Sequence, residues 1–257
     1  MEYHVPSVWL AAQVLKLLSR HKYKCCSLKD IAQKLDASPT TCLRVLRTLE
    51  AESFVHYDTE TKKYSLGPYL IPLGNRAAEL NDSVARATAE IKRIASVTGL
   101  TTVLIQRWDD RLVYTASAEQ PSNGVRLSIS VGQQIPMTSG AHGRCFLAFE
   151  DEAEVQRLIS MGLRPVTNES ITDPQRFIDA VREVRRNGYA VSHGEIIPGF
   201  SAVDVPVFSK TGDVELVISS MYVTSQMAMD ELSGLITLLV TTSRKLSEWS
   251  GFLAMWG

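Results

Sequence analysis

Residues 27–66 read SLKDIAQKLDASPTTCLRVLRTLEAESFVHYDTETKKYSL, and the architecture of the chain's first part can be predicted from them. Ser27 and Asp30 form a variant capping box in front of a short apolar stripe, which predicts a helix ending near Asp36. Ser38-Pro39 is a second start signal, because serine caps the free first-turn N–H groups and proline needs none of its own. The spacing therefore predicts two helices joined by a tight turn, the second running to about residue 52.

Two short strands are expected directly after this helix pair. Residues 54–57 and 62–66 are rich in aromatic and β-branched side chains and flank the polar turn at 58–61. Lys62 and Lys63 lie beside that turn, where they could meet a phosphate backbone. Helix, turn, helix and hairpin in this order predict a winged helix-turn-helix, whose common use is to place its second helix in the major groove of DNA.

The outward face of the predicted second helix carries the candidate DNA contacts. Arginine can reach guanine edges or phosphates, and threonine can contact thymine methyls or phosphate oxygens. The alternative is that these residues are solvated side chains on an ordinary surface helix. With the lysines of the wing, the predicted DNA-binding residues are Ser38, Thr40, Thr41, Arg44, Arg47, Thr48, Lys62 and Lys63.

Helical patterns flank this block on both sides. Residues 7–20 read as an amphipathic helix that packs on the next two. Beyond Gly67, apolar residues from Leu70 to Val84 recur about every 3.5 positions, which predicts a linker helix at 68–81 with a narrow apolar seam. This helix either packs on its own domain or pairs two copies of the chain on the half-sites of a pseudo-palindrome.

Length and charge agree with a division into two domains. The chain has 257 residues, 45% of them hydrophobic, which is enough for one small and one medium core. We expect a DNA-binding domain at 1–67, the linker helix at 68–81 and a larger domain at 82–257. The net charge of −1 divides into +4 for residues 1–76 and −5 for the remainder, so the small domain suits a polyanionic partner.

Several protein classes are disfavoured by what the sequence contains. No apolar run is long enough for a membrane span, and the first residues do not resemble a secretory signal, so we expect a soluble cytoplasmic protein. The four cysteines show no metal-ligand or disulfide spacing, and we expect neither a metal nor a cofactor. His142 and Cys145 could form a nucleophilic pair on one helix, but a packed cysteine beside an unrelated histidine is preferred, and we assign no catalytic residue.

The larger domain reads as an α+β fold in which helices cover a mixed antiparallel sheet. Strands are expected at 102–108, 111–118, 125–130, 189–193, 201–208 and 214–222. Helices are expected at 138–149, 151–160 and 173–187, with a closing helix marked by apolar residues from Leu232 to Trp249.

Three ordered blocks resemble the IclR-type transcriptional regulators over nearly the whole chain. SPTTCLRVLRTLEAESFVHYDTETKKYSLG at 38–67 resembles the winged helix of that family, VGQQIPMTSGAHGRCFLAF at 131–149 its pocket loop and helix, and GYAVSHGEIIPGFSAVDVPVF at 188–208 the signature of its ligand domain. The resemblance implies a GAF-like effector domain and a homodimer or dimer of dimers. It also implies DNA binding that is changed by a small, often acidic or aromatic, metabolite.

The resemblance also implies an effector site. Gly140 and Ala141 match the family loop whose N–H groups hold an effector carboxylate, and a helix start suits an anion; the alternative is that the glycines of this loop serve only helix–sheet packing. Ser192-His193 and Ser201 replace charged residues common in the family, which favours a bulkier or aromatic ligand. The implied effector-binding residues are Met137, Gly140, Ala141, Ser192, His193, Ala202, Asp204, Ser219 and Met221.

The leading interpretation is a DNA-binding regulator whose larger domain senses a small molecule. Two alternatives remain open from the sequence: an enzyme with an appended DNA-binding domain, and a constitutive DNA-binding protein whose larger domain only oligomerises. Ligand binding that alters operator affinity would distinguish the regulator from both.

Overall fold

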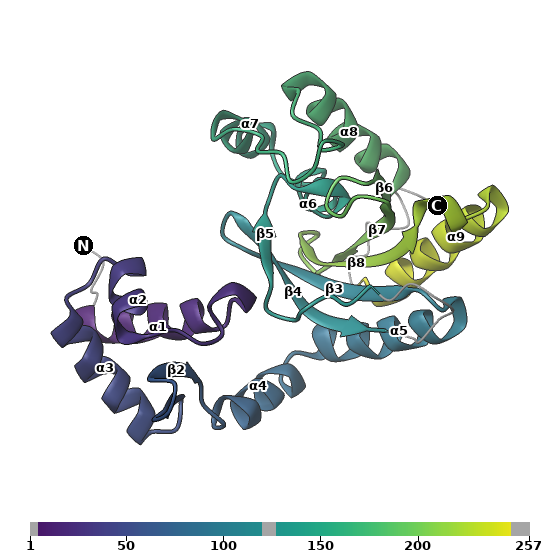
Figure 1. The fold of residues 1–257 in the computed structure, drawn as a ribbon. Coiled ribbons are helices and arrows are strands. Elements are labelled where there is room, and N and C mark those ends of the chain that lie inside the picture. Colours follow the sequence, from purple (N-terminus) through teal and green to yellow (C-terminus); the bar gives the residue numbers. More distant parts are fainter. Residues whose placement is uncertain (1–4, 120–126, 248–257) are drawn as a thin grey trace. The chain divides into compact units, whose positions relative to one another are not determined.

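The computed structural model describes residues 5–119 and 127–247 (Figure 1). The chain divides into two compact units, residues 1–82 and 83–257, and each is described by itself below. The position of Trp249, expected in the closing helix, falls outside the described residues. Among the helices of the described part, none combines the length and the apolar character that a bilayer crossing requires.

The first unit begins with several helices, and those at 28–34 and 39–51 start at the capping residues that the sequence predicts. They are α1 (Pro6–Leu18), the short 3-10 helix η1 (His21–Tyr23), α2 (Leu28–Lys34) and α3 (Pro39–Ala51). At the start of α2, the hydroxyl of Ser27 accepts from the N–H of Asp30 and the Asp30 carboxylate accepts from the N–H of Ser27, so the predicted capping box is confirmed. Asp36 takes a positive φ of 48° in the turn between α2 and α3.

The wing is an antiparallel pair of strands, β1 (Val55–Asp58) and β2 (Lys63–Leu66). The middle of β2 also bridges back to the segment before α2, because Tyr64 and Cys26 exchange two backbone hydrogen bonds of 2.7 and 3.0 Å. One apolar core unites helices and wing through buried side chains of α1, α2, α3 and both strands. The predicted winged helix-turn-helix is therefore present.

The apolar repeat after the wing is divided between two helices. Helix α4 (Leu70–Glu79) has no buried residue, whereas α5 (Asp82–Thr98) buries one face. Between them, Leu80 ends α4 as its C-cap, and Val84 already packs against the core of the second unit. The predicted apolar seam is therefore not one continuous surface. It is exposed along α4 and becomes buried in α5.

Within the described residues, the second unit contains a six-stranded sheet in the order β5-β4-β3-β8-β7-β6, with every neighbouring pair antiparallel. Its strands are β3 (Thr101–Trp108), β4 (Arg111–Ala118), β5 (Gln134–Pro136), β6 (Ala190–His193), β7 (Phe200–Phe208) and β8 (Val214–Val223). Its further helices are α6 (Gly140–Leu147), α7 (Glu152–Ser160), α8 (Pro174–Asn187), the 3-10 helix η2 (Thr224–Gln226) and α9 (Met229–Leu246).

Helices cover both faces of this sheet (Figure 1). Side chains alternate between the faces along each strand. One set packs with α5 and α9, the other with α6, α7 and α8. On β7, for example, Val203 and Val205 belong to the α5/α9 core and Ala202 to the α6 core. The sheet therefore separates two cores.

One expected strand is wrong in its described part. Residues 127–130 have no strand structure, and residues 125–126 of that prediction lie outside the described part. The strand that pairs with β4 is instead β5, which begins at Gln134. Three residues are too few to show a clear period of two, so sequence alone did not reveal β5.

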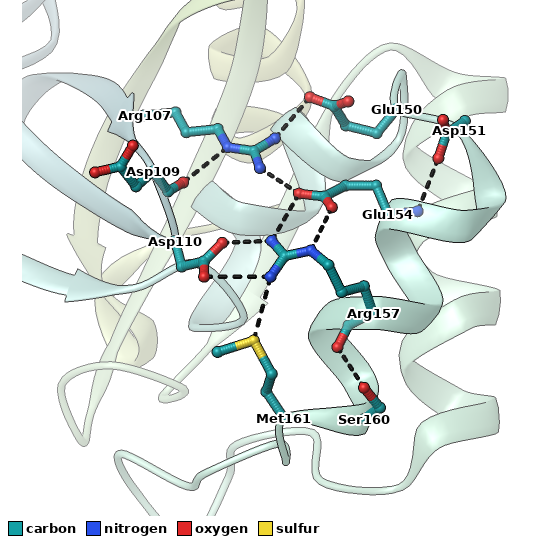
Figure 2. A network of polar contacts seen from close by, with 9 residues as sticks. All are labelled: Arg107, Asp109, Asp110, Glu150, Asp151, Glu154, Arg157, Ser160 and Met161. Carbon is teal, nitrogen blue, oxygen red and sulfur yellow. Dashed lines mark hydrogen bonds and ion pairs between the residues drawn. The ribbon is translucent and has the colours of Figure 1, made fainter. Parts of the chain in front are cut away.

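Charged side chains connect the β3–β4 hairpin to α7 (Figure 2). Arg107 lies 2.7 Å from Glu150 and also pairs with Glu154, while Arg157 pairs with Asp110 and lies 2.7 Å from Glu154. The hydrogen bond from Arg157 lowers the pKa of Glu154 most. Burial raises this pKa somewhat and the hydrogen bond from Arg107 lowers it further, so that it lies at about 2. The network holds α7 beside the β3–β4 hairpin.

Candidate DNA-binding surface and effector site

Helix α3 presents most of the predicted DNA contacts to solvent. It buries Cys42, Val45, Leu46 and Leu49, and the residues predicted to reach DNA are exposed. At 100° per residue, Thr40, Arg44 and Arg47 lie opposite the buried stripe. This is the geometry that a recognition helix requires.

Three of the predicted hydroxyls, those of Ser38, Thr41 and Thr48, already make hydrogen bonds within this segment, and Ser38 Oγ lies 2.8 Å from Thr41 Oγ1. Ser38 caps α3, since its oxygen accepts from the N–H of Thr41 at 3.1 Å. The hydroxyl of Thr48 donates to the carbonyl oxygen of Arg44 at 3.1 Å. Thr41, Arg44 and Thr48 also line a groove of about 420 Å³ with Val8 of α1. The exposed face opposite the buried stripe therefore consists of Thr40, Arg44 and Arg47.

The wing tip presents both predicted lysines. Asp58 Oδ1 accepts from the N–H groups of Glu60 and Thr61 at 2.8 and 3.1 Å, which closes the turn. These hydrogen bonds lower the pKa of Asp58 and keep its carboxylate charged, and those from Thr61 have the largest effect. Lys62 follows with a positive φ of 57°, and both Lys62 and Lys63 are exposed.

Most of the implied effector residues lie together on one face of the sheet. Ala202 pairs with Ser192 on one side and Met221 on the other, and Asp204 pairs with Ser219, so these five share the face under α6. All five are buried, as are Met137, Gly140 and Ala141. The structure does not bring His193 into this group. It follows Ser192 on β6, extends from the opposite face, and lies 3.0 Å from the hydroxyl of Ser201.

The start of α6 carries free backbone donors. Ser139 is the N-cap of α6 but makes no capping bond with its side chain. Among the described residues, the N–H groups of Gly140 and Ala141 have no hydrogen-bond acceptor. Gly140 has a φ of +61°, and a Cβ built there would lie 2.7 Å from Cδ1 of Ile196. Ile196, in the loop between β6 and β7, thus covers this helix start.

Three polar atoms near this helix start are buried and lack a hydrogen-bond partner within the described residues: Ser139 Oγ, Asp204 Oδ1 and Ser219 Oγ. They come from the N-cap of α6 and from the paired positions of β7 and β8. Buried polar groups in folded proteins are almost always hydrogen-bonded, and each one left unpaired costs free energy. A cluster of three marks a place where a polar ligand would be stabilising.

A buried relay of three side chains, which sequence reasoning missed, adjoins these atoms. Nδ1 of His142 on α6 lies 2.7 Å from Asp204 Oδ2, and Nε2 lies 3.1 Å from the Tyr114 hydroxyl on β4. Burial, followed by the charge of Asp204, raises the pKa of Tyr114, which remains a neutral hydroxyl. No sequence spacing indicates this relay, because its members lie on three separate elements.

Cys145 is not a nucleophile paired with His142. Its thiol is completely buried and lies 3.6 Å from the carbonyl oxygen of Asp204, while His142 is engaged elsewhere. Burial, followed by the negative charge of Asp204, raises the pKa of Cys145 well above its usual value. A thiol that stays protonated is a packing residue.

The loop over the α6 start is anchored at Glu195. Arg144 on α6 forms two hydrogen bonds of 2.7 Å with the Glu195 carboxylate, and both side chains are buried. The hydroxyls of Thr167 and Ser170 donate to the carbonyl oxygens of Gly194 and Glu195 at 2.7 and 2.9 Å. Backbone and side chain are thus fixed one residue before Ile196.

Comparison with known proteins agrees with this architecture. The chain is 28% identical over 222 residues to the HTH-type transcriptional regulator BhcR of Paracoccus denitrificans, covering 86% of this chain and 79% of that one. The crystal structure of an IclR transcriptional regulator from Alicyclobacillus acidocaldarius has 53% identity and a TM-score of 0.92, covering 97% of this chain and all of that one.

A second solved structure shares the fold and holds a small molecule. It is an IclR homologue from Microbacterium hydrocarbonoxydans in complex with 4-hydroxybenzoate, with 18% identity, a TM-score of 0.78, and coverage of 93% of this chain and 97% of that one. At this identity the likeness shows the fold alone.

Two family models match the two parts of the chain. The IclR helix-turn-helix domain matches residues 11–59, and the model described as bacterial transcriptional regulator IclR C-terminal matches residues 77–248. Models and relatives alike are transcriptional regulators and not enzymes. The chain belongs to the IclR family of bacterial transcriptional regulators.

Proposed function

We propose that this regulator binds a pseudo-palindromic operator as a dimer and that a small carboxylate bound beside α6 changes its affinity for DNA. The observation that carries the effector part is the group of unpaired polar atoms at the α6 start. Free N–H groups at a helix start attract an anion, and the buried hydroxyls beside them add hydrogen bonds. The family member that holds 4-hydroxybenzoate, itself a carboxylate, supports the ligand class.

In the proposed DNA complex, α3 occupies the major groove. Thr40, Arg44 and Arg47 contact base edges or nearby phosphates, and Thr41 and Thr48 flank them. Lys62 and Lys63 contact the phosphate backbone from the wing. Ser38 contributes mainly by fixing the start of α3.

Dimerisation is proposed through the exposed apolar face of α4. Leu73 and Leu80 lie two helical turns apart on the same face, and both are large and exposed, although a monomeric helix rarely leaves such side chains in water. Pairing two copies along this helix would bring two recognition helices to adjacent half-sites.

The effector acts through linkage between its own binding and that of DNA. An acid that binds one dimer geometry more tightly than another shifts the population toward it, by no more than that difference in affinity. In the proposed site, Gly140 and Ala141 hold the carboxylate, and Met137, Ala202 and Met221 provide apolar walls. Ser192, Asp204 and Ser219 provide the polar side.

The test combines thermal shift with DNA binding. Full-length protein selects its preferred sites from random duplex DNA, and fluorescence anisotropy then measures affinity for that duplex with and without each acid of a panel. We expect at least one acid both to raise the melting temperature and to change the DNA Kd. Acids that stabilise the protein without changing DNA affinity, or no binding acid at all, would contradict the proposal and favour a constitutive DNA-binding protein.

A further inference from the structure

Asp204 presents one carboxylate oxygen that nothing in the described structure satisfies. The residue is fully buried in the middle of β7. Its Oδ2 lies 2.7 Å from Nδ1 of His142, whereas Oδ1 has no hydrogen-bond partner among the described residues. A carboxylate only accepts hydrogen bonds, so Nδ1–H of His142 is the donor in the first contact. The group missing at Oδ1 is therefore a second donor.

His142 cannot supply the second donor to Asp204 Oδ1, because its Nδ1–H already donates to Oδ2 and its Nε2 faces Tyr114. With Nδ1 protonated toward Asp204, Nε2 accepts from the Tyr114 hydroxyl at 3.1 Å. The two rings meet edge to face, with centroids 5.7 Å apart and planes at 87°. The Tyr114 O–H thus donates to His142, and the His142 N–H donates to Asp204. These two hydrogen bonds hold the Asp204 carboxylate through Oδ2 only.

The polar groups of the proposed site differ in whether they donate or accept hydrogen bonds. Ser219 lies directly across from Asp204 in the β7–β8 pair, and the hydroxyls of Ser219 and Ser139 are buried without partners. Hydroxyls can donate or accept, so they tolerate many ligands. The ends of the site are selective, because Gly140 offers only an N–H donor and Asp204 only an acceptor.

We propose that the effector is a hydroxy acid, whose carboxylate lies against the N–H groups of Gly140 and Ala141 and whose hydroxyl donates to Asp204 Oδ1. This inference rests on the proposed function and specifies its ligand. A second carboxylate at Asp204 would meet a like charge in a buried place. An ammonium would also donate to Asp204 Oδ1, but its transfer from water into a site walled by Met137 and Met221 costs more free energy than the transfer of a neutral hydroxyl.

Asp204 is thereby the residue that discriminates between ligands. A site built to hydrogen-bond a hydroxyl binds the analogue that lacks it much less well, because its own buried group is then left unpaired. We expect each hydroxy acid that fits to bind at least about tenfold more tightly than its deoxy partner.

Isothermal titration of the full-length protein with matched acids tests this expectation. The pairs are 4-hydroxybenzoate with benzoate, 3-hydroxypropionate with propionate, and 6-hydroxyhexanoate with hexanoate; β-alanine supplies the ammonium analogue of the second pair. The expected result is a preference of at least about tenfold for the hydroxy acid in a binding pair, and weaker binding of β-alanine than of 3-hydroxypropionate.

Two variants locate the preference. In Asp204→Asn the acceptor is neutral and its hydrogen bond weaker, so the ratio between hydroxy and deoxy acid should fall at least about threefold. Ser201→Ala is the matched control, because Ser201 is a buried hydroxyl on β7 that faces away from α6. Its ratio should equal that of the wild type. Circular dichroism and DNA binding without acid verify that both variants are folded.

The outcomes separate this inference from the proposed function. Acids that bind and change DNA affinity without a preference for the hydroxyl would overturn the inference and leave the proposed function standing. The same holds if β-alanine binds more tightly, or if Asp204→Asn keeps the full ratio while folded. If no acid binds, the carboxylate site fails and the inference fails with it.

Discussion

Gly143 on α6 passes so close to Met137 that a Cβ on Gly143 would lie 1.7 Å from the Met137 carbonyl oxygen. No rotation of a side chain can relieve this contact, because the obstacle is backbone. The absence of a side chain at residue 143 allows α6 to follow β5 directly, and this close approach positions Gly140 and Ala141 at the helix start.

Gly143→Ala should therefore destabilise the protein by about 2 kcal/mol or more, which is typical of strain in a packed core. Gly234→Ala is the matched control, since Gly234 lies inside α9 with nothing within 4 Å of a built Cβ. Alanine there should stabilise by up to about 1 kcal/mol. Urea unfolding measures both, and equal stabilities for the two variants would contradict the packing described for α6.

His142→Leu should cost about 3 kcal/mol or more, because it leaves the Asp204 carboxylate buried with neither oxygen paired. The double variant His142→Leu with Asp204→Leu removes both partners and should be less destabilised than the sum of the single variants. Thermal unfolding of all four proteins completes the cycle. Additive effects would show that the His142 to Asp204 contact contributes no coupling.

Glu154→Gln tests the network of Figure 2. Hydrogen bonds from arginine lower the folded pKa of Glu154 to about 2 from its usual 4.5, so ionised Glu154 stabilises the fold above the unfolded pKa. The variant should be less stable by about 1 kcal/mol at pH 7. This difference should shrink as the pH falls from 4.5 toward 2. A difference that is constant across that range would exclude Glu154 ionisation as its cause.

Arg44→Ala and Lys62→Ala should weaken DNA binding in different ways. If Arg44 reads a base, its loss costs about 1 to 3 kcal/mol on the preferred duplex and little on unrelated DNA. Loss of Lys62 should weaken binding on all sequences and reduce the slope of log K against log salt by about one. Anisotropy titrations at several salt concentrations distinguish these effects, and near-zero changes in both variants would rule out the proposed docking.

Leu73→Asp should convert the proposed dimer to monomer. Leu73 is 43% exposed on a helix with no buried residue, so the change should leave the fold of the first unit intact. Sedimentation velocity reports the mass, and circular dichroism reports the fold. A variant that remains dimeric would place the interface elsewhere on the chain.

The winged helix-turn-helix was predictable because its signals are local. Ser27 with Asp30, and Ser38 with Pro39, act within one helical turn, and the starts of α2 and α3 follow from them. The exposed arginines of α3 follow from the same periodicity. Here the sequence and the structure agree closely.

The second unit was less predictable where its structure depends on contacts between residues far apart in the sequence. The three residues of β5 become a strand only through their pairing with β4. Helix α4 ends at Glu79 although the apolar repeat continues. The relay from Tyr114 to Asp204 spans β4, α6 and β7, and no motif connects residues so far apart. His193 was grouped with the effector residues, but alternation along β6 directs it to the other face.

The anchored loop between β6 and β7 bears on how long an acid would stay bound in the proposed site. In the proposed site, the pair of Arg144 and Glu195 holds the residue before Ile196, so a small acid would leave past a rotated Ile196 side chain, whereas a larger one would need the buried ion pair to break. The second event is slow compared with side-chain rotation. A large effector would therefore have a long residence time, and transcription would follow the average concentration of its metabolite over that time instead of each brief fluctuation.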